Sequence, residues 1–254
     1  MAKTNETKYK YDLTEPNLKI ANSYLRIAFD TICKIQKDEN YVCELIDIDD
    51  EGDDGDDDNK YKIYERNYII TLASLFSNNN VKRNNKEISG YINGEVAKKL
   101  KLPEYDDTAY FDKYIEKKAL SEKKEMPNSS RKERKQVHVF PDFLIHEKNS
   151  FDPSNMSRET QHFIMEAKTT EIKDEIKFWF DFLKLNFYIE KLRFDNAVYF
   201  ILGTPLSKIN TYIQNYMDDE NVVCCGDEIN RIFFIVQEKI ESKPELYVIR
   251  RSLK

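Results

Sequence analysis

The sequence predicts an α/β protein in which a mixed central sheet is flanked by helices. Two observations carry this prediction: helical patterns dominate the first third of the chain, and β-branched or aromatic runs alternate with helical patterns from residue 137 onward. Of the 254 residues, 40% are hydrophobic and 34% are charged, so the chain can bury a core and does not resemble the disordered class.

Residues 1–61 are expected to form an N-terminal helical extension of the main domain. Apolar residues recur at helical spacing over 17–36, which predicts an amphipathic helix. The segment 47–58 contains nine acidic residues and is expected to be a solvated loop, because like charges repel one another. It lacks the ligand spacing of an EF-hand. Weak divalent-cation binding, mimicry of a phosphate backbone and contact with a basic partner protein are its alternatives.

The acidic segment 47–58 also sets the sign of the net charge. The whole chain has a formal net charge of −6, but without this segment basic residues exceed acidic ones by three. A polyanionic partner is therefore compatible with the remainder of the chain.

The main domain is expected to span 62–254. A helix is predicted over 64–76, with Glu65 in its first turn. A polar and basic insertion is expected at about 78–136, beginning with a loop at 78–90 that is rich in Asn and Lys.

The rest of the insertion predicts short helices near 94–101 and 107–119, followed by a basic stretch. Residues 117–135 contain eight basic side chains and no regular periodicity. The stretch is either a solvated linker or a basic arm that contacts phosphates. The residues expected to contact nucleic acid are Arg131, Lys132, Arg134 and Lys135.

The second half of the chain predicts the sheet. Strands are expected at 137–146 and 162–168, and a helix at 171–194. The continuous apolar run at 196–203 ends in glycine and is typical of a buried central strand. A helix opened by a proline is expected at 205–217. Short strands are expected at 221–225, 231–237 and 246–250.

Three charged side chains interrupt the two strands at 137–146 and 162–168. Asp142 lies in FPDFLIH, and Glu166 and Lys168 lie in HFIMEAK. Alternate residues of a strand share one face, so Glu166 and Lys168 project together, and pairing of the strands would bring Asp142 to them. Two carboxylates beside an ammonium suit a hard cation such as Mg²⁺ and the activation of water.

The combination of motifs is more specific than either part. Glu-x-Lys occurs eight times, but only the occurrence at Glu166 follows a run of three apolar residues, and Pro-Asp occurs once. PDFLIH followed by FIMEAK resembles the PD-(D/E)xK nuclease superfamily. The resemblance implies a restriction endonuclease-like fold, with Mg²⁺ or its substitute Mn²⁺ bound by Asp142 and Glu166, and with Lys168 assisting the attacking water. Many members add a glutamate from a preceding helix, which Glu65 matches.

The resemblance continues into the predicted helix at 171–194 and the strand that ends at Gly203. Restriction-like proteins of this superfamily often place an aspartate and a lysine on that helix, as Asp181 and Lys184 are placed here. No chemical role is assigned to these two residues. The implied function is a metal-dependent endonuclease acting on DNA, with RNA as an alternative substrate, and restriction or defence follows by fold analogy alone. Cutting of both strands would favour a homodimer.

Other interpretations of the chain remain open. It could be a noncatalytic nucleic-acid-binding protein of the same fold, or a protein–protein module that uses the acidic segment. Asp142 could cap a turn while Glu166 and Lys168 form an exposed pair on a sheet edge. The three histidines, His138, His146 and His162, suggest a rival metal or acid–base site, although four residues of strand separate His138, Asp142 and His146 by roughly 13 Å each.

The location of the protein is expected to be cytoplasmic. The first residues lack the apolar run of a signal peptide, and no later segment approaches the ~20 apolar residues that span a bilayer. No membrane partner is expected.

Overall fold

The computed structural model describes the residues that form the sheet and its helices. These are residues 9–16, 23–35, 65–78, 82–83, 86–87, 91–94, 141–147, 156–219 and 226–253, here called the described chain. Several expectations lie outside it: the acidic segment 47–58, the basic stretch 117–135, the helix at 107–119, nearly all of the helix at 94–101 and the strand at 221–225.

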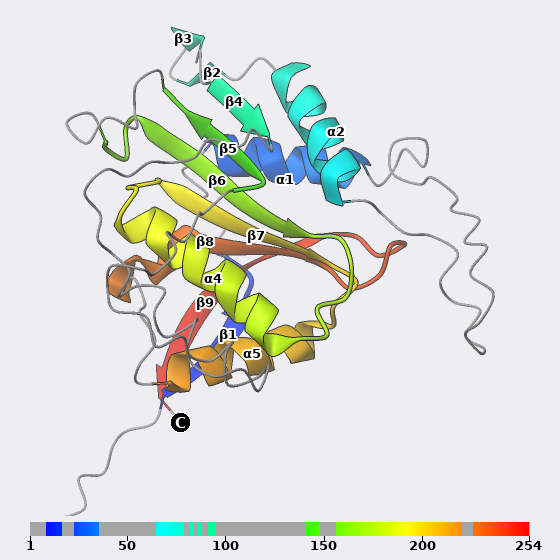
Figure 1. The fold of residues 1–254 in the computed structure, drawn as a ribbon, viewed down its shortest axis with the longest axis vertical. Helices are drawn as coiled ribbons and strands as arrows, with labels where there is room; N and C mark the ends of the chain where they lie inside the picture. The colour runs from blue at the N-terminus through cyan, green and yellow to red at the C-terminus, as the bar shows by residue number, and fades with distance from the viewer. Residues whose placement is uncertain are drawn as a thin grey trace, which may run out of the picture.

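A seven-stranded mixed sheet forms the centre of the fold (Figure 1). Its strands, in spatial order, are β1 (Tyr9–Thr14), β9 (Glu245–Leu253), β8 (Ile232–Gln237), β7 (Asn196–Leu202), β6 (Gln161–Lys168), β5 (Phe143–His146) and β4 (Tyr91–Gly94). The β6–β7 and β7–β8 pairs are parallel and all other pairs are antiparallel. The predicted mixed sheet is confirmed, and so is the central, fully buried strand at its middle, β7.

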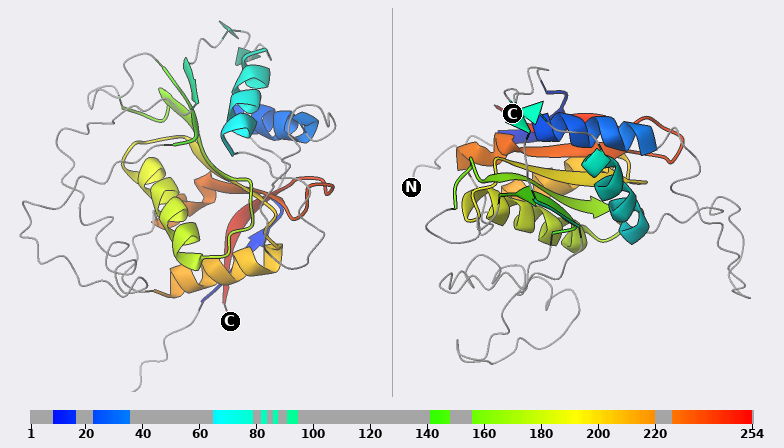
Figure 2. Two further views of the ribbon diagram at one scale, coloured as in Figure 1. Left: turned by 45° about the vertical axis from the view of Figure 1, so that its right-hand side comes forward. Right: turned by 90° about the horizontal axis from the view of Figure 1, so that it is seen from above.

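Helices cover both faces of the sheet, which gives three layers (Figure 2). One face packs against α1 (Ser23–Ile35) and α2 (Glu65–Asn78), and the other packs against α4 (Glu175–Glu190) and α5 (Leu206–Asp218). The remaining elements are the small β2 (Lys82–Arg83) and β3 (Lys86–Glu87) pair and the 3₁₀ helix η1 (Gly226–Arg231). No helix of the described chain combines the length and apolar character that crossing a membrane requires.

Helix α4 links the parallel strands β6 and β7, as a parallel connection requires. Its N-terminus is fixed by Asp174, whose carboxylate accepts a hydrogen bond from the Ile176 backbone N–H at 2.9 Å. Eleven of its 16 residues are buried, so apolar side chains surround it on most sides. Three of the buried side chains are Asp181, Lys184 and Tyr188, which face the sheet.

The N-terminal region differs from the expected helical extension. Residues 9–14 form β1, which pairs with β9 at the far end of the chain, and α1 packs against α2 and β6 across the expected boundary at residue 61. The expected loop at 78–90 likewise contains β2 and β3, and β4 follows it at the sheet edge. β2 and β3 have only two residues each, while β1 and β4 pair with strands that lie far away in the sequence.

The outer edge of β1 is closed by side chains of α5. The Tyr11 N–H donates to Gln214 Oε1 and the Leu13 N–H donates to Asn210 Oδ1, each at 2.9 Å. Gln214 Nε2 also donates to the Tyr9 carbonyl at 3.3 Å. These bonds satisfy backbone groups that an edge strand would otherwise leave open to another chain.

We expect the double substitution Asn210→Ala and Gln214→Ala to loosen β1, because two of its amides lose their acceptors. The amides of Tyr11 and Leu13 should exchange with deuterium at least about tenfold faster, as NMR can measure. Asn215→Ala is the matched control, since that side chain contacts α4 instead of β1. Unchanged exchange at both amides would show that α5 does not secure the edge.

Candidate active site

Strand pairing brings Asp142 beside Glu166. In the β5–β6 pair Phe143 lies opposite Met165, and the Asp142 N–H donates to the Met165 carbonyl at 3.2 Å. Continuing this register by one residue places Asp142 opposite Glu166. The chain bends at Asp142, so its side chain turns back toward β6, where Oδ2 accepts a hydrogen bond of 2.7 Å from the Ala167 N–H. The expected pairing of the two strands that carry Asp142 and Glu166 is confirmed.

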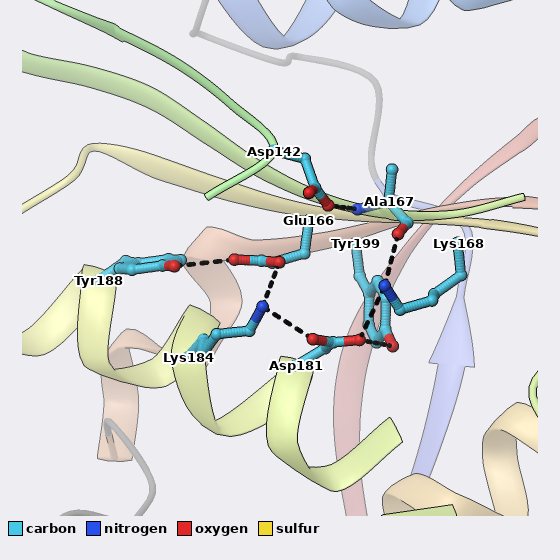
Figure 3. Close-up of polar contacts among 8 residues, drawn as sticks. All are labelled: Asp142, Glu166, Ala167, Lys168, Asp181, Lys184, Tyr188 and Tyr199. Atoms are coloured by element: carbon cyan, nitrogen blue, oxygen red, sulfur yellow. Dashed lines mark hydrogen bonds and ion pairs between the residues drawn. The ribbon is translucent and has the colours of Figure 1, made fainter. Parts of the chain in front are cut away.

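Glu166 points from β6 toward α4 and is only 1% exposed (Figure 3). Its Oε1 accepts a hydrogen bond of 2.8 Å from the Tyr188 hydroxyl. Its Oε2 contacts the Lys184 ammonium in an ion pair. Both oxygens of this buried carboxylate are therefore engaged by α4.

Asp181, on α4, is a further carboxylate of the site and contacts two ammonium groups. Its Oδ1 lies 2.8 Å from Lys184 Nζ, and its Oδ2 lies 3.4 Å from Lys168 Nζ. The Tyr199 hydroxyl of β7 donates to Oδ2 at 3.1 Å. Lys168 Nζ also donates to the Ala167 carbonyl at 3.0 Å, which holds its ammonium close to the strand (Figure 3).

The two lysines of this network differ in their access to solvent. The Lys184 side chain is 9% exposed, whereas the Lys168 side chain is 27% exposed. Lys168 is therefore the ammonium that a molecule arriving from solvent can reach, while Lys184 balances charge in the interior.

Burial controls the protonation of the site. It raises the pKa of Glu166 to about 8; Lys184 opposes this rise, and the nearby carboxylates of Asp142 and Asp181 add to it. For Lys184, burial favours the neutral amine, but the charges of Glu166 and Asp181 outweigh it and raise the pKa. Burial also raises the pKa of Asp142, against the Ala167 N–H bond and the two lysines.

The donor chemistry of Asp142 and Glu166 fits a hard divalent cation, because such ions prefer carboxylate oxygens. Within the described chain, however, no three His, Cys, Asp or Glu side chains are gathered closely enough to hold a metal ion. Glu65 is the first residue of α2, which covers the face of the sheet opposite to α4, and its side chain is outside those described. For an ion to bind Glu166 Oε2, the ammonium of Lys184 has to move away.

The structure rules out one alternative and gives another no support. β6 lies between β5 and β7, so Glu166 is not part of an exposed pair on a sheet edge. His146 Nδ1 lies 2.7 Å from the Glu147 carbonyl, and the His162 ring stacks on the Tyr24 ring at 4.9 Å. Both histidines lie at the end of the β5–β6 pair away from Asp142. His138 and the four predicted nucleic-acid contacts, Arg131, Lys132, Arg134 and Lys135, lie outside the described chain.

Four network residues were given no function by the sequence: Asp181, Lys184, Tyr188 and Tyr199. The first three follow one another at intervals of three and four residues, which places them on one face of a helix. Polar residues at that spacing inside an otherwise apolar helix are the signal that could have found them. Tyr199 lies within a continuous apolar run and carried no such signal.

No protein-family model, curated protein or solved structure matches this chain. The functional conclusion therefore depends on the geometry of the site and on the motif.

The raised pKa of Glu166 predicts how stability changes with pH in EDTA. Between the ordinary pKa near 4.5 and about 8, the folded protein retains a proton that the unfolded chain has lost. The free energy of unfolding therefore falls as pH rises through this window, by roughly 1 kcal/mol per pH unit. Glu166→Gln removes the titrating group, so its stability, measured by urea unfolding, should change less.

Glu171→Gln is the control for this prediction. Glu171 is exposed, and its hydrogen bond with Lys208 lowers its pKa, so its loss should leave the fall between pH 4.5 and 8 in place. Parallel stability curves for wild type and Glu166→Gln would contradict the assignment.

Proposed function

We propose that this chain is a divalent-metal-dependent nuclease that hydrolyses phosphodiester bonds of DNA, with a fold of the restriction endonuclease-like type. The observation that carries the proposal is the approach of Asp142 and Glu166 on adjacent strands, with the Lys168 ammonium on the same strand as Glu166. The order of elements supports it as well. A helix precedes the motif strands, and α4 with Asp181 and Lys184 follows them, before a buried strand that ends at Leu202 and is followed by Gly203.

Asp142 and Glu166 are the residues that would hold the cation, Mg²⁺ or Mn²⁺. Such a cation, when bound, supplies a Lewis acid that polarises a phosphoryl oxygen and lowers the pKa of water. Lys168 would donate hydrogen bonds to the attacking water or to the negative charge that develops on the phosphate. Asp181 and the Ala167 carbonyl keep its ammonium at the site before substrate arrives.

The hydrogen bond between Asp142 and the Ala167 N–H has a separate function in this proposal. It uses one carboxylate oxygen and fixes the orientation of the group, and the second oxygen forms no hydrogen bond within the described chain. A carboxylate that is oriented in advance loses less conformational freedom when it binds an ion. The arrangement thus prepares Asp142 as a ligand without engaging both of its oxygens.

DNA is the proposed substrate for two reasons. A metal ion with a lysine beside it suits the hydrolysis of phosphodiester bonds, and basic residues exceed acidic ones in the chain outside 47–58. The basic stretch 117–135 directly precedes the motif strands in sequence and would add phosphate contacts. A function in restriction or defence is an analogy with the family that the motif resembles.

We expect Asp142→Ala and Lys168→Ala each to slow cleavage of supercoiled plasmid in Mg²⁺ by at least about 100-fold. The first removes an oxygen ligand and the second removes the ammonium that stabilises developing charge. Gel assays in Mg²⁺, Mn²⁺ and EDTA on plasmid and on single-stranded DNA measure both effects. Lys177→Ala, an exposed lysine of α4, should cleave as wild type does.

Cleavage that needs metal and is lost in both variants would support the proposal. Wild-type protein that binds DNA but cuts neither substrate in either metal would contradict catalysis and favour the noncatalytic nucleic-acid-binding alternative.

The predicted basic arm, Arg131, Lys132, Arg134 and Lys135, should contribute to the salt dependence of DNA binding. Replacing its four residues by alanine should reduce the slope of log K against log salt concentration by about 3 to 4 for double-stranded DNA, because each phosphate contact contributes about 0.9. Fluorescence anisotropy at several salt concentrations measures this slope. An equal reduction after replacing four exposed residues elsewhere would show a general charge effect instead; the control set is Lys173, Lys177, Lys239 and Lys243.

A further inference from the structure

Lys184 holds the position of a cation at the centre of the candidate site. Its ammonium contacts Glu166 Oε2, lies 2.8 Å from Asp181 Oδ1 and lies 5.2 Å from the centroid of the Phe180 ring. Its side chain is 9% exposed, so solvent contributes little to its stabilisation. Two carboxyl groups and one aromatic ring therefore stabilise this ammonium.

Glu166 cannot contact the Lys184 ammonium and a divalent cation through the same oxygen. Tyr188 occupies Oε1 and Lys184 occupies Oε2, so an ion that approaches Glu166 meets either a hydroxyl donor or an ammonium. An ammonium in contact with the ligating oxygen would repel a second cation strongly at this depth. Lys184 is the group that has to give way, because the cation and the ammonium would occupy the same place beside Glu166 Oε2.

The other two contacts of Lys184 give it an alternative resting place. Asp181 is one turn away on α4 and is itself held by the Tyr199 hydroxyl at 3.1 Å. The face of the Phe180 ring offers a weaker, electrostatic attraction for an ammonium. Lys184 can therefore keep two of its three contacts when its ammonium leaves Glu166.

We propose that Lys184 is a built-in counter-ion that closes the metal site, and that a divalent cation binds by displacing its ammonium from Glu166 onto Asp181 and the Phe180 ring. This inference rests on the proposed function, since it concerns the same two metal ligands. It implies that Lys184 lowers the affinity of the site for a divalent cation. It also gives a reason why α4 buries both a lysine and an aspartate against β6.

The test is Mn²⁺ binding by the full chain without DNA. Binding is measured as the decrease of the EPR signal of free Mn²⁺. Lys184→Gln retains a hydrogen-bond donor but removes the charge, and it should bind Mn²⁺ at least about tenfold more tightly than wild type. Lys184→Arg retains a cation and should stay within about twofold of wild type. Asp142→Asn measures Mn²⁺ bound elsewhere, including at the acidic segment 47–58.

Lys208→Met is the matched control. Lys208 pairs with Glu171 at 2.8 Å on the surface, so its removal deletes a Lys–Glu pair outside the site and should leave Mn²⁺ affinity unchanged. Equal affinity of wild type and Lys184→Gln at the site that Asp142→Asn removes would overturn the inference. Absence of any binding that depends on Asp142 would overturn it too.

A second measurement uses wild-type protein and so does not depend on a variant that folds. The ¹⁵Nζ NMR signal of the Lys184 ammonium, assigned with Lys184→Arg, should shift on addition of Mg²⁺, while the Lys208 signal should not. A rise in the melting temperature with Mg²⁺ and an unmoved Lys184 signal would contradict displacement. Metal affinity that depends on Lys184, without DNA cleavage, would support this inference and contradict the nuclease proposal. DNA cleavage with metal affinity that does not depend on Lys184 would support the nuclease proposal and contradict this inference.

Discussion

A carboxylate buried in the middle of a sheet imposes the main constraint on this structure. Glu166 is nearly inaccessible to solvent, and a carboxyl group at such depth is costly to bury unless its oxygens have hydrogen-bond partners. The fold meets this constraint with α4, which brings an ammonium and a hydroxyl to the two oxygens. Both partners lie on α4, so the packing of α4 against β6 is tied to Glu166.

Much of the fold could be predicted from patterns that are local in sequence. β6, β7, β8, α4 and α5 show their character within a window of a few turns or strand residues, because each buries a long apolar face. β1 and β4 could not be predicted in this way. They are short edge strands whose hydrogen-bond partners, β9 and β5, are distant in the sequence, so their stability comes from contacts that no window contains.

The residues of the candidate site also divide into those that the local sequence indicates and those that only the packing shows. Asp142, Glu166 and Lys168 were found because a motif with fixed spacing carries them and because strand geometry relates their faces. Asp181 and Lys184 matched the family resemblance in position, but the sequence assigned them no chemical role. Their importance depends on burial against β6, which follows from the packing of α4 and not from the pair itself. Tyr188 and Tyr199 needed the packing for the same reason.

The pairing of β1 with β9 has a consequence for the order in which the protein folds. The β6–α4–β7 unit joins segments that are neighbours in sequence, so its contacts close short loops and can form early. The β1–β9 ladder joins residues near Tyr9 to residues near Leu253, and closing so long a loop is slow. Until β1 pairs with it, β9 has an uncovered edge, so the last contact along the chain also protects this side of the sheet from pairing with another molecule.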